Sequence, residues 1–362
     1  MDYLREVFDK KRIKLLISAG ISLVVGLILV LIGVKVANSL IDQNFAKRWI
    51  KDDSYAQVTA FFSELADFTD QSAKELEYKI SNKLTEESFA PESEDSRLWV
   101  YCYSAIGKVE VVSKMKSASV KAIGVGGDFF MFHPKDIING SLFSGDTMMK
   151  DLVVINEDTA FELFGSNDVV GQAVEIGGVR HIISGVVKRE EGKLNDKAGN
   201  NEPTMYLSYE ALSEHGKVTY INSFEALLPN PLTGYAKDLL AKQISVPENR
   251  FDVIENSHRF KWTKLLINIK NFGLRSMNPK GLVYTYWENI ARGIEDYLTP
   301  VTVIATILLL YPCAIILYVL KRMWNKRRIH RGDVKDFAER RLEEYRERRK
   351  LAKRGEDEYE EI

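Results

Sequence analysis

Histidines are the side chains best suited to metal binding or proton transfer, and four of them, His133, His181, His215 and His258, lie in the central part of the 362-residue sequence. A zinc site on a helix needs histidines at i and i+4, and the small structural zinc sites need cysteines at fixed spacing. None of the four has such a partner along the sequence. We therefore predict no metal site, and no cofactor.

A glycine cluster from Gly124 to Phe129 has some of the letters of a phosphate-binding loop and of a nucleotide-cyclase motif. The phosphate loop requires a lysine that does not follow here, and the cyclase motif requires a missing glutamate. Glycines of this kind commonly form a turn with positive φ. We interpret the cluster as such a turn and predict no cofactor-binding residue.

The remaining candidates for catalysis are hydroxyl and carboxylate groups between residues 141 and 158. Ser141 and Ser144 lie in NGSLFSGD, which lacks the G-x-S-x-G frame of a nucleophile elbow. Asp151, Glu157 and Asp158 could form a carboxylate pair, but capping of a short helix by Asp158 explains them without chemistry. We predict no catalytic residue and a protein that is not an enzyme.

The composition points away from nucleic acid as a partner. The sequence has 50 Lys and Arg against 51 Asp and Glu, so its formal net charge is -1, with 45% hydrophobic residues. This balance excludes a histone-like basic protein and a disordered acidic tail. The apolar residues are instead concentrated in two blocks.

These two blocks have the length of membrane-spanning helices. About 20 uncharged residues separate Lys14 from Lys35, and about 24 separate Asp296 from Lys321, enough to cross a hydrocarbon core of about 30 Å. We assign them as transmembrane helices at 15–41 and 297–320. A cleaved signal peptide is the alternative for the first block, but Lys35 stands where cleavage wants a small residue.

Flanking charge predicts the orientation. Basic residues cluster before the first block and after the second, from Lys321 to Arg331. Because cytoplasmic flanks carry an excess of Lys and Arg, both termini are predicted to be cytoplasmic. The predicted domains are a cytoplasmic segment 1–14, an extracytoplasmic domain 42–296 and a cytoplasmic tail 321–362 in a two-pass protein of the cell membrane.

The predicted outer domain is of the α+β class, with two βαβ-like lobes around a strand-rich inserted subdomain at 128–210. The first lobe begins with a half-buried strand, in which Val58, Ala60 and Phe62 alternate, and a helix after Thr69 follows. A hairpin is then predicted to turn at Ile106–Gly107. The second lobe covers a strand at 218–228, a helix at 232–244 and a strand at 251–254, and an amphipathic stretch from Trp262 leads toward the second block.

Two neighbouring stretches, GGDFFMFHPKDIINGSLFSGD and DLVVINEDTAFELFGSNDVVGQAVEIGGVRHIISGVVKRE, cover about 65 consecutive residues from Gly126 to Glu190. This segment resembles the extracytoplasmic core domain of MacB/FtsX-type ABC permeases. The positions that match the family pattern are Phe129, Phe130, Gly140, Phe143, Asn156, Glu157, Ala160, Leu163, Phe164, Gly165, Gly171, Gly185 and Val186.

The resemblance implies a non-catalytic permease-like subunit whose outer domain moves when a cytoplasmic ABC ATPase closes. The matched residues are structural in that family. Such permeases usually have four spans, whereas this sequence has one after the outer domain, so we expect a reduced, two-span version. No G-x-x-x-x-G-K-[ST] pattern occurs, and ATP hydrolysis is therefore expected from a separate subunit.

The expected partners are this ATPase, a further permease subunit and membrane lipid. The tail after the second block is the candidate docking segment for a cytoplasmic partner, and a solvated charged helix is its alternative interpretation. Its candidate docking residues are Lys321, Arg322, Lys326, Arg327, Arg328, Phe337, Leu342 and Tyr345.

Two other functions remain open from the sequence. A scaffold like the two-span regulators of polysaccharide chain length has the same topology, although its outer domain should show long heptad helices instead of short strands and glycine turns. An extracytoplasmic ligand sensor that acts through a cytoplasmic partner is the second alternative.

Overall fold

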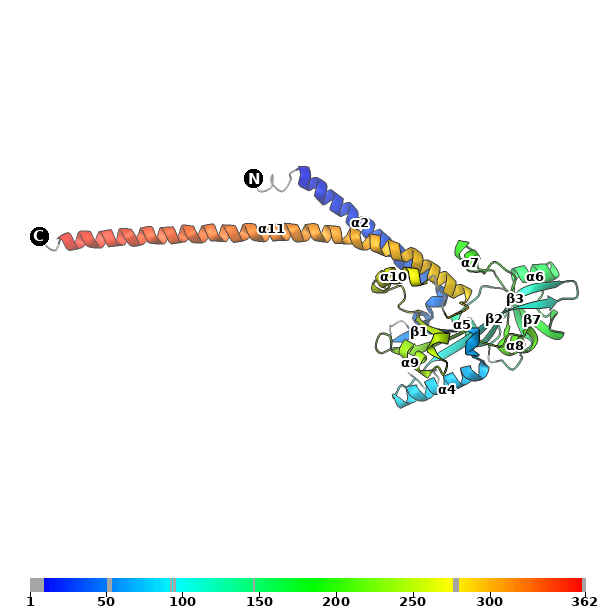
Figure 1. Ribbon diagram of the computed structural model, residues 1–362. Coiled ribbons are helices and arrows are strands. Elements are labelled where there is room, and N and C mark those ends of the chain that lie inside the picture. The colour runs from blue at the N-terminus through cyan, green and yellow to red at the C-terminus, as the bar shows by residue number, and fades with distance from the viewer. Residues whose placement is uncertain are drawn as a thin grey trace. The chain divides into compact units, whose positions relative to one another are not determined.

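The computed structural model describes residues 10–50, 54–91, 93, 96–145, 147–275 and 280–359 (Figure 1). The chain forms two compact units. One comprises Met1–Leu31 and Val303–Ile362, and the other comprises Ile32–Thr302. We describe each unit by itself.

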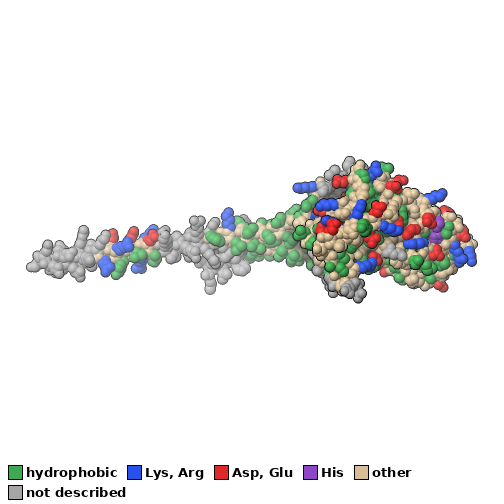
Figure 2. Space-filling model, turned by 90° about the horizontal axis from the view of Figure 1, so that it is seen from below, with side chains coloured by type: hydrophobic (Ala, Val, Ile, Leu, Met, Phe, Trp, Pro, Cys, Tyr) green, Lys and Arg blue, Asp and Glu red, His purple; other side chains and the backbone are tan. Residues whose placement is uncertain are grey.

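The first unit contains most of α2 (Lys10–Ser39) and of α11 (Tyr286–Tyr359). Ile13–Ser39 and Tyr286–Lys321 are long and apolar enough to cross a membrane. Their large apolar side chains point outward, as Leu31 and Leu317 do with two thirds of their surface exposed, and Figure 2 shows hydrophobic side chains along this unit. Such a surface suits a hydrocarbon environment, where helices satisfy their own backbone hydrogen bonds.

Small residues on α2 bring the two helices of this unit together. Ser18, Ser22 and Gly26 follow at i, i+4 and i+8, on one face of the helix. The hydroxyl of Ser22 donates to the carbonyl oxygen of Leu308 at 2.7 Å, and a Cβ on Gly26 would lie 3.0 Å from the side chain of Leu309. Small residues and interhelical hydrogen bonds are typical of helix packing in membranes.

The second unit is built on a ten-stranded sheet in the order β10-β1-β9-β2-β3-β8-β5-β7-β4, with β6 paired to β2 and β7. The pairs β3·β8 and β5·β7 are parallel, and the other pairs are antiparallel. The strands are β1 (Tyr55–Phe62), β2 (Val100–Val112), β3 (Ser117–Gly127), β4 (Ile137–Gly140), β5 (Leu152–Asn156), β6 (Ala173–Ile176), β7 (Val179–Val187), β8 (Thr204–Ser208), β9 (Ser223–Pro229) and β10 (Phe251–Glu255).

Two strand-helix-strand units interlock in one half of this sheet. The first is β1, α4 (Asp70–Glu86) and β2, and the second is β9, α9 (Tyr235–Gln243) and β10. Strand β9 lies between β1 and β2, which is the split βαβ arrangement. The predicted α+β class is confirmed, and the predicted helix after Thr69 begins there with a capping box that Thr69 forms with Ser72.

Helices cover both faces of the sheet. One face packs against α4, α9, α6 (Glu157–Phe164) and α8 (Tyr209–Gly216), in a core that includes Phe62, Ile80 and Leu212. The other face packs against α3 (Phe45–Trp49), α5 (Phe129–Phe132) and the start of α11. The remaining described helices are α7 (Lys193–Lys197), α10 (Trp262–Arg275), η1 (Ile41–Gln43), η2 (Glu64–Ala66) and η3 (Glu248–Arg250).

Two predictions about β1 and β2 were wrong. Strand β1 is buried on both faces from Ala56 to Phe62, and not only on the face of Val58 and Ala60. The predicted turn at Ile106–Gly107 does not exist, because β2 continues through it and pairs with β3 as far as Val112. Gly107 is needed for packing, since a Cβ there would lie 2.4 Å from a methyl group of Val218.

The glycine cluster is only partly the turn that the sequence predicts. Gly127 has a φ of +62°, but Gly124 and Gly126 lie within strand β3. A Cβ on Gly126 would stand 2.1 Å from Cζ of the Tyr103 ring. The hydroxyl of that ring donates to Asp70, at the start of α4. Two of the three glycines thus leave room for neighbouring side chains.

Candidate functional site

Polar side chains occupy the sheet face that α3, α5 and α11 cover. Alternation along β1 places Gln57 and Thr59 on this face, and alternation along β9 places Glu225 there. All three are at most 2% exposed. Since a buried carboxylate is costly unless it is paired and hydrogen-bonded, Glu225 must find partners in the elements above it.

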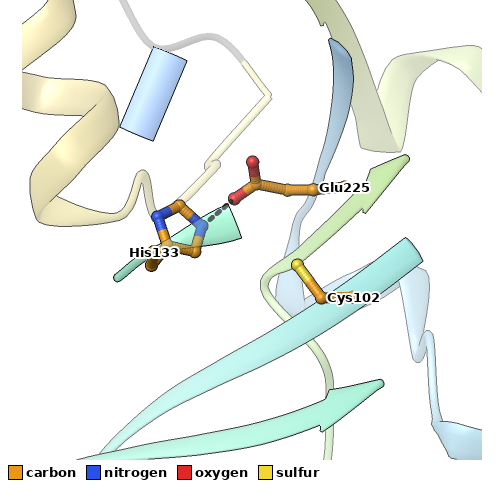
Figure 3. Close-up of side chains that lie close together, drawn as sticks. All are labelled: Cys102, His133 and Glu225. Carbon is orange, nitrogen blue, oxygen red and sulfur yellow. Dashed lines mark hydrogen bonds and ion pairs between the residues drawn. The ribbon is translucent and has the colours of Figure 1, made fainter. Parts of the chain in front are cut away.

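His133 is the main partner of Glu225. It follows α5, and its Nε2 lies 2.9 Å from Oε1 of Glu225 (Figure 3). Its Nδ1 lies 2.8 Å from Oδ1 of Asp42, in η1 just after α2. The imidazole is completely buried and bridges two carboxylates.

Three more donors complete the coordination of Glu225. Nε1 of Trp287, in the first turn of α11, donates to Oε1 at 3.0 Å. Oε2 accepts from Nε2 of Gln57 at 3.3 Å and from the hydroxyl of Thr59 at 3.2 Å. The carboxylate therefore has four partners, two from β1, one from the residue after α5 and one from α11. We call Asp42, Gln57, Thr59, His133, Glu225 and Trp287 the central network.

The electrostatics of the central network favour a charged histidine. Burial lowers the pKa of His133, but the charge of Glu225 and the hydrogen bonds to both carboxylates outweigh it and raise the pKa to about 9. Burial raises the pKa of Asp42, yet the hydrogen bond with His133 and the charge of Lys135 hold it below its usual range. At neutral pH an imidazolium thus lies between two carboxylates.

Cys102 raises the question of a metal site, because its Sγ lies with ligand atoms of His133 and Glu225 inside 4.8 Å. Figure 3 shows the sulfur near the carboxylate, with only His133 and Glu225 joined. Burial raises the pKa of the Cys102 thiol well above its usual value. A metal would have to displace protons from both the thiol and the imidazolium and replace the bond between His133 and Glu225. The donor set therefore fits a hydrogen-bonded ion network better than a metal centre.

A second cluster anchors α11 from the other side. Arg259, 6% exposed, donates to Glu288 at 2.7 and 3.0 Å and to Glu295 at 3.0 and 3.1 Å. Burial lowers the pKa of Arg259, but the charges of these two carboxylates outweigh burial and raise the pKa above its usual value. Asn256 links the cluster to the central network, since it accepts from Arg259 and donates to Thr59 at 2.8 Å.

Lys135 makes a third connection to the start of α11. Its Nζ lies 2.5 Å from Glu190 and 2.6 Å from the hydroxyl of Tyr286. At the end of α2, Asn44 donates to the carbonyl oxygens of Ala37 and Leu40 at 2.9 and 2.7 Å. Hydrogen bonds and ion pairs therefore tie both the end of α2 and the start of α11 to the sheet.

The family-motif residues predicted from the sequence form core and turns beside this site. Asn156, and not Asp158, caps α6 by accepting the Thr159 N–H at 2.9 Å, so the predicted capping residue was wrong. Gly165 ends that helix with a φ of +71°. The others are buried (Phe129, Phe143, Ala160, Leu163, Val186), half-buried (Phe130, Phe164), at positive φ (Gly140, Gly171), pressed against Ser141 (Gly185) or bonded to the Arg189 N–H (Glu157).

The described part of the predicted docking tail belongs to helix α11. Its residues Phe337, Leu342 and Tyr345 are each more than half exposed. Lys321 is exposed as well. The side chains of Arg322, Lys326, Arg327 and Arg328 lie outside the described residues.

Replacing His133 tests the central network. In the variant His133→Gln both carboxylates lose a charged partner, and breaking a buried ion pair costs about 3–5 kcal/mol. We expect the melting temperature of the full chain in detergent to fall by on the order of 10 °C. The double variant H133Q/E225Q should recover part of the loss. His215→Gln, next to the exposed Glu214, is the control and should change little. Equal melting temperatures for H133Q and H215Q would contradict the assignment.

The raised pKa of His133 also predicts a dependence of stability on pH. A pKa that folding raises from 6.5 to about 9 contributes about 3 kcal/mol. This contribution is complete below pH 6.5 and disappears as the pH rises through about 9. The stability difference between wild type and H133Q, measured by thermal unfolding, should therefore shrink as the pH rises from about 8 to about 10. A constant difference across this range would show that the imidazole is neutral.

Comparison with known proteins identifies the family. The sequence model for the MacB-like periplasmic core domain matches residues 15–233. A macrolide export ATP-binding/permease protein, MacB, of Chromobacterium violaceum is 31% identical over 94 residues, which cover 25% of this chain and 14% of that protein. The match thus spans about one seventh of the curated relative.

Two solved structures are also similar. The periplasmic region of MacB from Actinobacillus actinomycetemcomitans is 14% identical with a TM-score of 0.42, over 62% of this chain and 94% of that one. The extracellular domain of the noncanonic ABC-type transporter YknZ from Gram-positive bacteria is 15% identical with a TM-score of 0.38, over 55% and 99%. The family match covers more than half of the sequence and confirms the resemblance to MacB/FtsX-type permeases. The chain therefore belongs to the MacB-like periplasmic core domain family.

Proposed function

We propose that the chain is a non-catalytic, permease-like membrane subunit of an ABC transporter complex. Family membership supports the permease role, and the two apolar helices fit a membrane protein with an extracytoplasmic domain. The curated relative combines ATP binding with a permease in its name, whereas this sequence has no phosphate-binding loop. In our proposal a separate cytoplasmic ABC ATPase hydrolyses ATP, and a further permease subunit completes the membrane part.

The mechanism that we propose is the transmission of motion from the membrane helices to the extracytoplasmic domain. The observation that carries it is the set of three polar clusters that fasten Asp42, just after α2, and the first turns of α11 to the sheet. Ionic contacts with several partners hold a fixed geometry better than apolar contacts, which can slide. A displacement of either helix end would then move the sheet as one body.

The topology completes this proposal. The basic flanks of the two spans favour cytoplasmic termini, with the sheet outside the cytoplasm. The helical tail would then lie in the cytoplasm, where the proposed ATPase is. Phe337, Leu342 and Tyr345, exposed on this helix, are its proposed docking residues.

Affinity purification tests the partnership. The full chain, tagged at its N-terminus and expressed at its native level, should bring down an ATP-binding subunit after extraction in mild detergent. The triple variant F337A/L342A/Y345A should reduce the recovered ATPase at least about tenfold, which corresponds to about 1.4 kcal/mol of binding.

The control replaces two apolar residues of the sheet-bearing unit that are even more exposed, Leu65 and Leu232, with alanine. This variant should recover the ATPase at the wild-type level. Recovery of the wild-type chain alone would contradict the proposed complex, and an unchanged yield with the triple variant would contradict docking through the tail.

A further inference from the structure

Helix α10 has an apolar stripe along one side. Trp262, Leu265, Leu266 and Ile269 follow at i, i+3, i+4 and i+7, the spacing of a single helical face. Lys264 lies on the opposite side of the helix, where with Asn268 it lines a pocket that also contains Asp252, Glu255 and Glu295. The sequence from Phe260 to Arg275 contains four basic residues and no acidic residue.

One part of this stripe packs against the outer parts of the apolar helices. Leu265 is 5% exposed and forms a small cluster with Ile294 and Leu298 of α11. Val36 and Leu40, at the end of α2, pack against the same cluster. Figure 1 shows α10 beside the first part of α11. Val36 and Leu298 both lie within the candidate membrane spans, so Leu265 packs against residues of both spans.

The stripe continues beyond this contact without cover. Ile269, one turn after Leu265 on the same face, is 48% exposed. Trp262 and Leu266 are half-buried. An apolar stripe that begins at the ends of two candidate membrane spans, on a segment with basic and no acidic residues, is the pattern of a helix that lies in the membrane interface.

We propose that α10 is an interfacial helix that rests on the lipid bilayer beside the two spans. Its stripe from Trp262 to Ile269 faces the boundary between headgroups and acyl chains, and Lys270, exposed at the edge of the stripe, faces anionic headgroups. The continuity of the stripe with the ends of both candidate spans commits the site to lipid. The absence of acidic residues from 260 to 275 favours an anionic surface.

Environment-sensitive labels on single cysteines test this proposal in the full chain. The background variant is Cys313→Ser, which leaves only Cys102, whose thiol is buried and has a raised pKa. A fluorescent NBD group is placed by Ile269→Cys or, as a matched control, by Ile267→Cys. The two isoleucines have similar exposures, 48% and 53%, and lie about 160° apart around the helix. Met148→Cys, at a residue 96% exposed, is the aqueous reference.

Each labelled chain is reconstituted alone in nanodiscs of phosphatidylcholine and phosphatidylglycerol, which prevents contact with a second copy. A nitroxide near the lipid headgroup should quench the label at 269 at least about twice as strongly as the label at 267. Aqueous iodide should quench the label at 148 most. In K270E the lipid quenching at 269 should lose its dependence on phosphatidylglycerol.

Two results would overturn the proposal. Iodide quenching at 269 as strong as at 148 would show that the stripe faces water. Shielding from iodide without lipid quenching would show that protein covers the stripe. Neither result bears on the association with an ATPase, so this test is independent of the proposed complex.

Discussion

The structure depends on one constraint: a carboxylate buried in the sheet needs partners, because water cannot reach it. Glu225 lies in the middle of β9 and is 2% exposed. Its partners come from β1, from the residue after α5 and from the first turn of α11. His133 then carries the connection on to Asp42, next to α2. Removing any one of these groups leaves a buried charge or donor uncompensated, so the set specifies a single arrangement.

The same constraint assigns a physical role to the end of α2 and the start of α11 in this structure. An apolar contact between a helix end and a sheet can slip by a fraction of an ångström at little cost, whereas a shared ion network has few alternative geometries. Arg259, with Glu288 and Glu295, and Lys135, with Tyr286, add two more fixed points along α11. These contacts support the proposal that the ends of both helices and the sheet move together. The interfacial helix that we propose would hold the same junction at the lipid surface.

The sequence predicts well those features that depend on local pattern. The length of the two uncharged blocks predicts both apolar helices. Short-range signals predict that α4 is capped by Thr69 and that α6 ends at Gly165. The central network was missed, because its members His133 and Glu225 are 92 residues apart. Gln57 and Thr59 alternate with apolar residues, so the pattern predicts a solvated face. Only the tertiary cover from α5 and α11 buries them, and no local pattern reports that cover. The local signal for the network was Glu225, a glutamate within the strand SFEALLP.

Hydrogen exchange of the full chain in nanodiscs tests the central claim most directly. If the network joins the helix ends to the sheet, the backbone amides of residues 223–227, 131–135 and 286–296 should exchange together, as slowly as those of the sheet core in β2 and β3. In H133Q the amides at 131–135 and 286–296 should exchange much faster while β3 stays protected. Fast exchange at 286–296 in the wild-type protein, with a protected sheet, would contradict the account, because the start of α11 would then open independently of the domain.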